Sequence, residues 1–242
     1  MKAGVASLIK SVLALLACCA AGVHGANLQI SPVTLTLRAA QSAAGINLQN
    51  LGDQPMYGQV RVFAWDQRDG EEVLAPTQEL VASPPIVEIA ANSRQAIRLV
   101  RAQAGSVAQE KTYRVLIDEV SRDDDLGRSG VDIRLRYSVP VFVLPAGAAG
   151  KEMLDWHIFR ERGEWMLRIK NSGNVHAQIG AMAFTNQAGK EFVISKGLFG
   201  YVLAARMRVW RLPVAREAEL DGPLSIAVNV NAKALVATNS TP

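Results

Sequence analysis

The sequence has 242 residues, of which 49% are hydrophobic and 20% are charged, a composition typical of a globular protein. It is too apolar for a disordered chain and too charged for a bundle of membrane helices. The formal charge of +4 is too small to indicate a nucleic-acid or membrane-surface partner, and 6% aromatic residues argue against an aromatic stacking surface.

The first 25 residues have the features of a secretory signal peptide. Lys2 and Lys10 precede an apolar run over residues 12–21, which is too short to cross a bilayer, and Gly25 provides a small residue before the expected cleavage site. We expect the mature chain to begin near Ala26 and to be exported. Both cysteines lie inside this segment, so the mature chain would have no disulfide. Processing at Cys18 with attachment of a lipid is the alternative.

Residues 26–145 alternate between apolar and polar residues in short runs, which is the pattern of half-buried strands. We predict strands over residues 28–37, 46–49, 57–65, 86–89, 95–100, 113–120 and 131–144. Turn sequences separate several of them, for example at residues 50–53 and 67–70. Short strands joined by turns indicate a β-sandwich, and no stretch has a convincing helical period.

A linker of small residues, 146–150, follows this first predicted domain. Beyond the linker the strand pattern resumes, with turn clusters at residues 171–174 and 186–189, and we predict a second, smaller β-sandwich over residues 151–242. The expected fold class is therefore all-β with two sandwich domains. No later segment approaches the roughly 20 apolar residues of a membrane-spanning helix.

The sequence contains no recognisable catalytic or metal-binding pattern, so we expect neither an enzyme nor a bound metal. His157 and His176 lie on different predicted strands without another ligand at metal-binding spacing, and we interpret them as solvent-facing strand or turn residues. The acidic run over residues 123–125 lacks the regular oxygen spacing of a calcium loop, which favours a solvated loop. There is also no nucleophile motif and no glycine-rich phosphate loop.

The strand predicted over residues 131–144 carries an unusual pair of cations. Val131, Ile133 and Leu135 fall on one face of this strand, whereas Arg134 and Arg136 share the other. An exposed edge strand that carries positive charge against aggregation is one interpretation, and periodicity alone favours it. The alternative is a carboxylate-binding anchor between the two sandwiches, because a guanidinium group holds a carboxylate through two parallel hydrogen bonds.

Three segments of the first predicted domain resemble the PapD-like periplasmic chaperones of the chaperone–usher pilus pathway. Residues 83–89 resemble the Thr/Ser-Pro-Pro segment that precedes a strand in that family, and residues 96–100 resemble its apolar-Arg-apolar strand. Residues 133–140 resemble its final-strand motif, Ile-Lys-Leu-x-Tyr-x-Pro, with Arg134 in place of the lysine. The order of the predicted elements agrees with the family over essentially the whole mature chain.

The resemblance implies a periplasmic chaperone built from two immunoglobulin-like sandwiches in an L-shaped arrangement, without ATP or a cofactor. Such a chaperone holds one pilus or fimbrial subunit, whose own sandwich lacks its last strand, and delivers it to an outer-membrane usher. It lends the subunit a strand of its first domain, which is donor-strand complementation. The implied donor row in this sequence is Val131, Ile133 and Leu135.

The family also holds the subunit's C-terminal carboxylate with two basic residues, and the resemblance carries over only one of them. Arg134 takes the position of the lysine in the last strand. The other position, an arginine of the first strand, falls on Thr34, which cannot pair with a carboxylate as a cation. Arg38 and Arg136 are possible stand-ins because each shares strand parity with the residue that it would replace or support.

The resemblance further implies that Arg98, Glu110 and Asp221 form a charged network that links the two domains. The chain departs from the family in the stretch before the anchor, where residues 123–130 lack the usual alternating large apolar residues, so the donated strand is expected to be short. The alternative function is a secreted two-domain β-sandwich binding or adhesion module without a chaperone role. Copurification of a subunit would distinguish the two.

Overall fold

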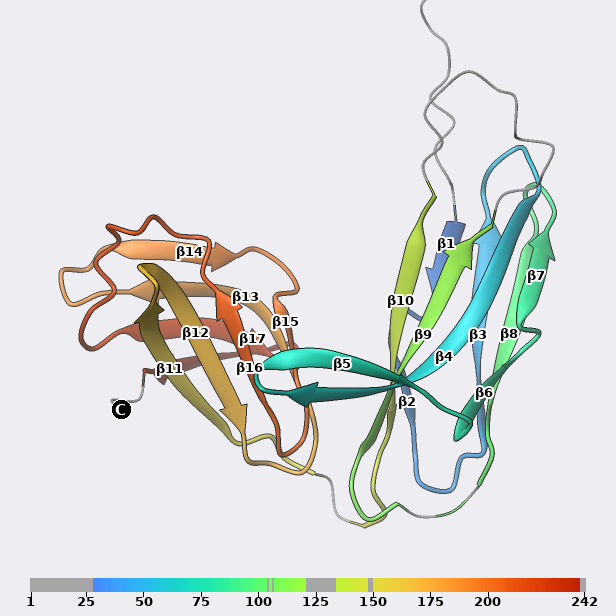
Figure 1. Cartoon of the computed structure of the whole chain (residues 1–242), viewed down its shortest axis with the longest axis horizontal. Coiled ribbons are helices and arrows are strands. Elements are labelled where there is room, and N and C mark those ends of the chain that lie inside the picture. Colours follow the sequence, from blue (N-terminus) through green and yellow to red (C-terminus); the bar gives the residue numbers. More distant parts are fainter. Residues whose placement is uncertain (1–27, 104, 106, 121–133, 148–149, 240–242) are drawn as a thin grey trace, which may run out of the picture.

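The computed structural model describes residues 28–103, 105, 107–120, 134–147 and 150–239. The predicted signal segment and two residues of the predicted donor row, Val131 and Ile133, lie outside these described residues. The described secondary structure consists of 18 strands, which agrees with the predicted all-β class. The described residues contain no helix that could cross a membrane. The strands form two domains set in an L (Figure 1).

The first domain contains ten strands in two sheets. Their bounds are β1 Leu28–Ser31, β2 Leu35–Leu37, β3 Ala43–Asn50, β4 Met56–Arg68, β5 Glu71–Pro76, β6 Leu80–Ser83, β7 Ile86–Ile89, β8 Arg94–Arg101, β9 Lys111–Glu119 and β10 Arg136–Val143. One sheet has the order β1-β3-β8-β6, and the other has the order β2-β10-β9-β4-β5 with β7 also paired to β4. The apolar residues of the alternating pattern fill the core between these sheets.

The second domain contains eight strands, also in two sheets. Their bounds are β11 Leu154–Glu161, β12 Glu164–Asn171, β13 Ala177–Thr185, β14 Glu191–Ser195, β15 Gly200–Val202, β16 Met207–Arg211, β17 Ser225–Val230 and β18 Lys233–Thr238. The sheet orders are β11-β12-β16 and β14-β13-β17-β18, with β15 also paired to β13. A separate apolar core lies between them, so each domain has its own interior.

The single strand predicted over residues 28–37 is two strands in the structure, and this prediction was wrong. β1 pairs with β3 in the four-stranded sheet, whereas β2 pairs in parallel with β10 in the other sheet. Pro32 lies between them, and because proline has no N–H it cannot continue the ladder of β1. The first segment of the chain therefore crosses from one sheet to the other and leaves only three residues of β2 beside β10.

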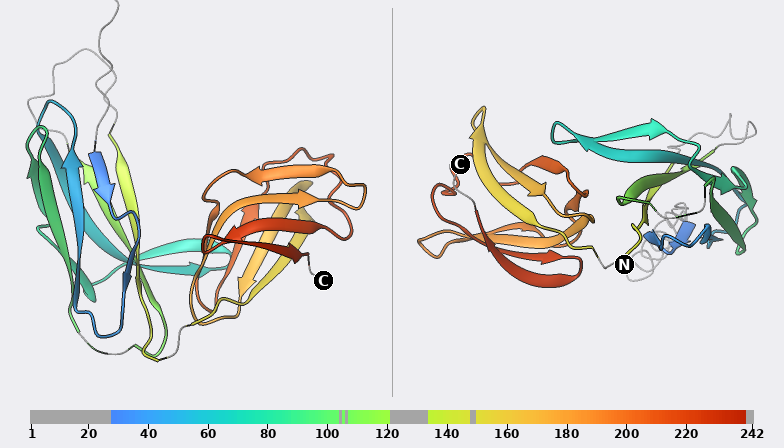
Figure 2. Two further views of the ribbon diagram at one scale, coloured as in Figure 1. Left: turned by 180° about the vertical axis from the view of Figure 1, so that it is seen from behind. Right: turned by 90° about the horizontal axis from the view of Figure 1, so that it is seen from below.

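The hairpin formed by β4 and β5 extends beyond the first sandwich and reaches the second domain, as both views of Figure 2 show. Its predicted turn is present, with Asp69 and Gly70 in the left-handed region at φ values of 52° and 79°. The carbonyl of Gly70 accepts a hydrogen bond from the N–H of Val209 in β16 at 3.0 Å. A side chain at position 70 would lie 2.6 Å from a methyl group of Val209, so the close approach of the hairpin tip requires glycine.

Candidate functional site

Four buried apolar residues join the two domains at the base of the L. Trp65 and Phe142 come from β4 and β10 of the first domain, whereas Tyr201 and Leu203 come from β15 and the residues after it. The rings of Trp65 and Tyr201 meet edge to face, with centroids 5.5 Å apart. We call this set the interdomain cluster. It is separate from the cores of both sandwiches, so it stabilises their relative placement.

Polar contacts surround the interdomain cluster. The buried amide of Gln67 donates to the carbonyl of Tyr201 at 2.8 Å and accepts from the N–H of Leu203 at 3.0 Å, as a neighbouring strand would. Asp66 pairs with Arg206 of the second domain at 2.6 Å. Burial raises the pKa of Asp66, but hydrogen bonds from Arg206 and from the backbone N–H of Gln67 outweigh it, and the pKa lies below its usual value.

The predicted interpretation of His176 as a solvent-facing residue was wrong. Its ring stacks on Phe142, with centroids 3.4 Å apart and the planes 5° from parallel. Glu110 accepts a hydrogen bond from the backbone N–H of His176 at 2.7 Å, and its other oxygen lies 2.8 Å from the ring nitrogen Nδ1. The side chain of Glu110 is fully buried, so this contact is enclosed between the domains.

Two residues of the predicted charged network, Glu110 and Asp221, have other partners in the structure. Glu110 contacts the second domain, as the network requires, but through His176. Asp221 lies 3.8 Å from Arg160 within the second domain, and 80% of its side chain is exposed. Arg98 is exposed on β8 in the four-stranded sheet. No ion pair among the described residues joins any two of these three.

We therefore expect Glu110→Gln to loosen the placement of the two domains and Asp221→Asn to leave it unchanged. A buried carboxylate that accepts two hydrogen bonds across an interface contributes more than an exposed ion pair at 3.8 Å, by about 1–3 kcal/mol. Small-angle scattering of both variants tests the difference. An altered profile for Asp221→Asn would contradict this expectation and would instead support the predicted network.

One face of the six-stranded sheet, which also contributes Trp65 and Phe142 to the interdomain cluster, carries both charged and apolar residues. In β10, Tyr137, Val139 and Val141 point into the core of the first domain, so the intervening residues point away from it. The same alternation holds in β4 and β9. We call this side the outer face, and its members are Arg61, Phe63, Trp65, Arg114, Leu116, Asp118, Arg136, Ser138 and Phe142.

A charged rung crosses three strands of the outer face. Asp118 of β9 lies between Arg61 of β4, at 2.6 Å, and Arg136 of β10, which is its direct cross-strand partner. Burial raises the pKa of Asp118, but the hydrogen bonds from Arg136 and Arg61 outweigh it and hold the pKa below its usual value. Two cations and one anion leave the rung with a net positive charge.

Arg134 lies just before β10 and is exposed. It precedes Arg136 by two residues, which is the spacing that places side chains on the same side of a strand. Arg38, one of the predicted stand-ins, lies near the opposite end of β10. The carbonyl of Leu37, the residue before it, accepts a hydrogen bond from the N–H of Leu144 at 2.9 Å. The ten residue-to-residue steps from 134 to 144 span about 33 Å of extended chain. Arg38 is therefore too distant to share a carboxylate with Arg134.

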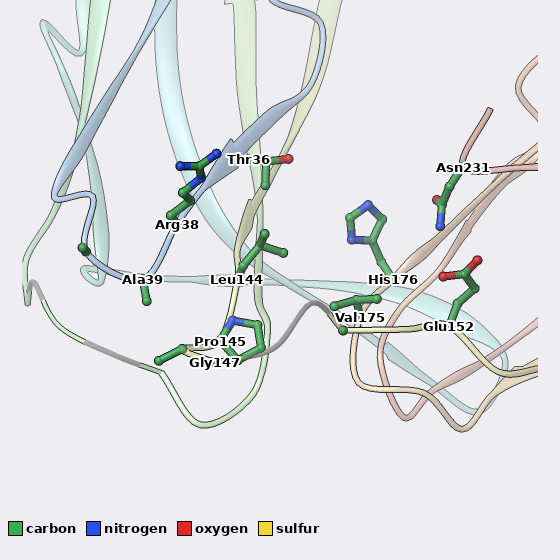
Figure 3. Close-up of a pocket in the computed structure, with 13 residues that line it drawn as sticks. Thr36, Arg38, Ala39, Leu144, Pro145, Gly147, Glu152, Val175, His176 and Asn231 are labelled. Atoms are coloured by element: carbon green, nitrogen blue, oxygen red, sulfur yellow. The ribbon is translucent and has the colours of Figure 1, made fainter. Parts of the chain in front are cut away.

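Arg38 lines a separate pocket instead, beside the linker (Figure 3). The pocket has a volume of about 710 Å³. Thr36, Arg38 and Leu144 line it from the first domain, and His176 and Asn231 line it from the second. It lies at the β2 end of the interface, away from the charged rung of Arg61, Asp118 and Arg136.

Within the described ranges, one edge of β10 has no strand partner over about half of its length. β9 pairs with β10 along Arg136–Val143, whereas β2 pairs only with Val141–Val143. The carbonyl of Leu135 accepts a hydrogen bond from the N–H of Glu119 in β9 at 3.1 Å. The odd-numbered residues of β10 therefore direct their backbone N–H and C=O groups toward β9. Among the described residues, Arg136 and Ser138 therefore present N–H and C=O groups to an edge without a strand partner. We call this edge the free edge.

The free edge ends, toward the C-terminal end of β10, at Pro140 and the start of β2. Pro140 has no N–H to offer, and one residue further the edge is already paired, because Leu35 lies opposite Val141. Thr34, the position at which the resemblance expects the arginine of the family, comes directly before Leu35 and is half-buried. An added strand would thus end beside Thr34 and Ser138, next to the charged rung.

Comparisons with known proteins agree with this architecture. Residues 27–149 match the family model of pili and flagellar-assembly chaperones, PapD N-terminal domain. No curated protein sequence matches the chain. A structure of the CsuC–CsuE chaperone–tip adhesion subunit complex from archaic chaperone–usher Csu pili of Acinetobacter baumannii is 23% identical, with a TM-score of 0.69 over 88% of this chain and 98% of that chain.

Two further solved structures are similar over nearly the same span. The YadV chaperone is 18% identical, with a TM-score of 0.62 over 88% of this chain and 98% of that chain. The Salmonella enterica SafA pilin in complex with the SafB chaperone is 15% identical, with a TM-score of 0.61 over 90% and 97%. At these identities the structural matches establish the shared fold of two immunoglobulin-like domains.

Proposed function

The chain belongs to the family of pili and flagellar-assembly chaperones, and we propose that it holds a pilus subunit in the periplasm through the free edge of β10 and passes it to an outer-membrane usher. The free edge is the observation that carries the proposal. At Arg136 and Ser138 it offers backbone N–H and C=O groups on a strand whose other edge is already paired with β9. A subunit that lacks its last strand has the complementary need, because its own backbone groups are unpaired.

Side chains on both faces of the lent strand support the same role. Leu135 belongs to the described part of the donor row, and it would cover the apolar groove of the subunit together with Val131 and Ile133. On the other face, Arg134 would hold the C-terminal carboxylate of the subunit. A charge-assisted bond of this kind contributes roughly 1.5–3 kcal/mol. Backbone pairing would give affinity, and the carboxylate would fix the register.

The comparisons favour a binding role over catalysis. The family is one of chaperones rather than of enzymes, and we propose that the chain works without ATP, metal or cofactor. Two of the similar structures are complexes of a chaperone with a pilus component, a tip adhesion subunit in one and a pilin in the other. The energy for capture and release would come from strand pairing alone, since a neighbouring subunit can later replace the lent strand.

Copurification tests the proposal directly. The full-length chain, with an affinity tag at its C-terminus, is produced together with the pilus subunits of its own organism and isolated from the periplasmic fraction. We expect one subunit to copurify with the chain in equal amounts and to be lost when the chain is unfolded. Isolation of the chain alone would favour the adhesion-module alternative.

A further inference from the structure

Arg136 belongs both to the charged rung and to the free edge, and its side chain cannot contact Asp118 and an incoming subunit strand in the same way at once. Its guanidinium group pairs with Asp118 on the β9 side of β10, whereas an incoming subunit strand would lie on the opposite side. The side chain of Arg136 is 62% exposed, and it is long enough to turn toward either neighbour. Turning toward the subunit would remove a counter-ion from Asp118, whose own side chain is only 15% exposed.

We propose that Arg61 is a second counter-ion, which keeps Asp118 neutralised when Arg136 turns to the carboxylate of the bound subunit. This inference rests on the proposed function. Arg61 is a positioning residue in this scheme, because it acts on the subunit only through Asp118 and Arg136.

The positions of the three strands allow this exchange. β9 lies between β4 and β10, so Arg61 contacts Asp118 from the side that faces away from the free edge. A strand added to β10 would therefore not displace it. The guanidinium group of Arg61 also lies 5.7 Å from the ring centroid of Phe63, a contact on its own strand that is independent of β10.

This change of partner by Arg136 would also compensate for the absence of a basic side chain at Thr34. A chaperone with two permanently free cations would have no competing anion, whereas here Asp118 competes with the subunit for Arg136. With Arg61 present, Asp118 keeps its ion pair with Arg61 both in the free chain and in the complex with the subunit. The cost of turning Arg136 is then only the difference in free energy between its contact with Asp118 and its contact with the carboxylate of the subunit. Arg136 thus becomes available as the second basic residue beside Arg134.

The test measures capture of the subunit that copurifies with the wild-type chain, diluted from denaturant onto immobilised variants over a range of subunit concentrations. We expect Arg61→Gln to weaken capture by about two- to fivefold, the range of an exposed ion pair, and Arg61→Lys to restore most of the loss. Asp118→Asn removes the competing anion and should tighten capture. Arg94→Gln, an exposed arginine on β8 of the opposite sheet, is the matched control.

The double variant Arg61→Gln with Asp118→Asn decides between a specific and a merely structural role. If Arg61 acts through Asp118, the double variant binds as tightly as Asp118→Asn alone. The inference is overturned if the double variant is as weak as Arg61→Gln, or if Arg61→Gln binds like the wild type. Normal capture by Arg136→Ala overturns it too but leaves the chaperone role intact, whereas failure of the wild type to capture any subunit refutes the proposed function itself.

Discussion

Replacing Arg134 by alanine is expected to abolish subunit capture while the chain remains folded. Arg134 lies on the exposed side of the segment that leads into β10, and no apolar core depends on its side chain. Removing one partner of a desolvated charged pair costs about 2–5 kcal/mol, because the carboxylate of the subunit would remain buried without its counter-ion. Since 1.4 kcal/mol is a factor of ten, affinity should fall at least tenfold.

Coexpression with the subunit, followed by pull-down and thermal melting of each variant, measures both parts of this expectation. Arg136→Ala should cause a comparable loss if Arg136 supplies the second basic contact, and a smaller one if it only supports Arg134. Arg98→Ala is the matched control, because Arg98 is exposed on the other sheet of the same domain. A normal yield of subunit with Arg134→Ala would show that the anchor assignment is wrong and return Arg134 to the role of a charged edge residue.

Local patterns were sufficient to predict most strands of the first domain and the faces of β10, but β5 and β6 were not among the predicted strands. Period-two alternation depends only on neighbouring residues, and Val139 and Val141 are buried where the pattern requires. The Asp69–Gly70 turn was predictable for the same reason, because its left-handed backbone conformations favour these residue types. The division of residues 28–37 into two strands was not, since it depends on which sheet each half joins.

The contacts between the domains could not be predicted from local patterns. The role of Gln67 arises only when β4 meets the second domain, and that of His176 only when its ring meets Glu110 and Phe142 of the first domain. Gln67 and Tyr201 are 134 residues apart in the sequence, and Glu110 and His176 are 66 residues apart. One signal was present. Phe63 and Trp65 are aromatic residues on the side of β4 opposite the apolar row of its core, which indicates a second buried surface. The partner on that surface could not be inferred from β4 itself.

The placement of the domains matters for the proposed function because the outer face and the interdomain cluster share one sheet. Arg114 illustrates the continuity, since its guanidinium group lies 3.6 Å from the ring centroid of Trp65 and 5.4 Å from that of Tyr201. A subunit held on β10 would meet the second domain at a position that this cluster determines. Loss of the cluster should therefore affect capture even though it lies outside the free edge.

Replacing Phe142 by alanine is expected to release the second domain from the first while both sandwiches stay folded. Phe142 is fully buried, stacks on His176 and lies 5.9 Å from the ring centroids of both Trp65 and Tyr201. Removing a buried phenylalanine costs about 3–5 kcal/mol. Because Phe142 belongs to neither sandwich core, this loss should fall on the interface between the domains.

Calorimetry and small-angle scattering together test this expectation. Separate unfolding transitions for the two domains and an expanded scattering profile would follow from a broken interface. Phe159→Ala is the matched control, because Phe159 is half-buried in β11 and its ring stacks on His157 within the second domain alone. A single transition and a wild-type profile for Phe142→Ala would mean that the ion pairs of Asp66 and the amide of Gln67 hold the domains together without the aromatic cluster. Subunit capture by Phe142→Ala should fall in parallel with the change in scattering, because a fixed angle places the second domain against the subunit that β10 holds.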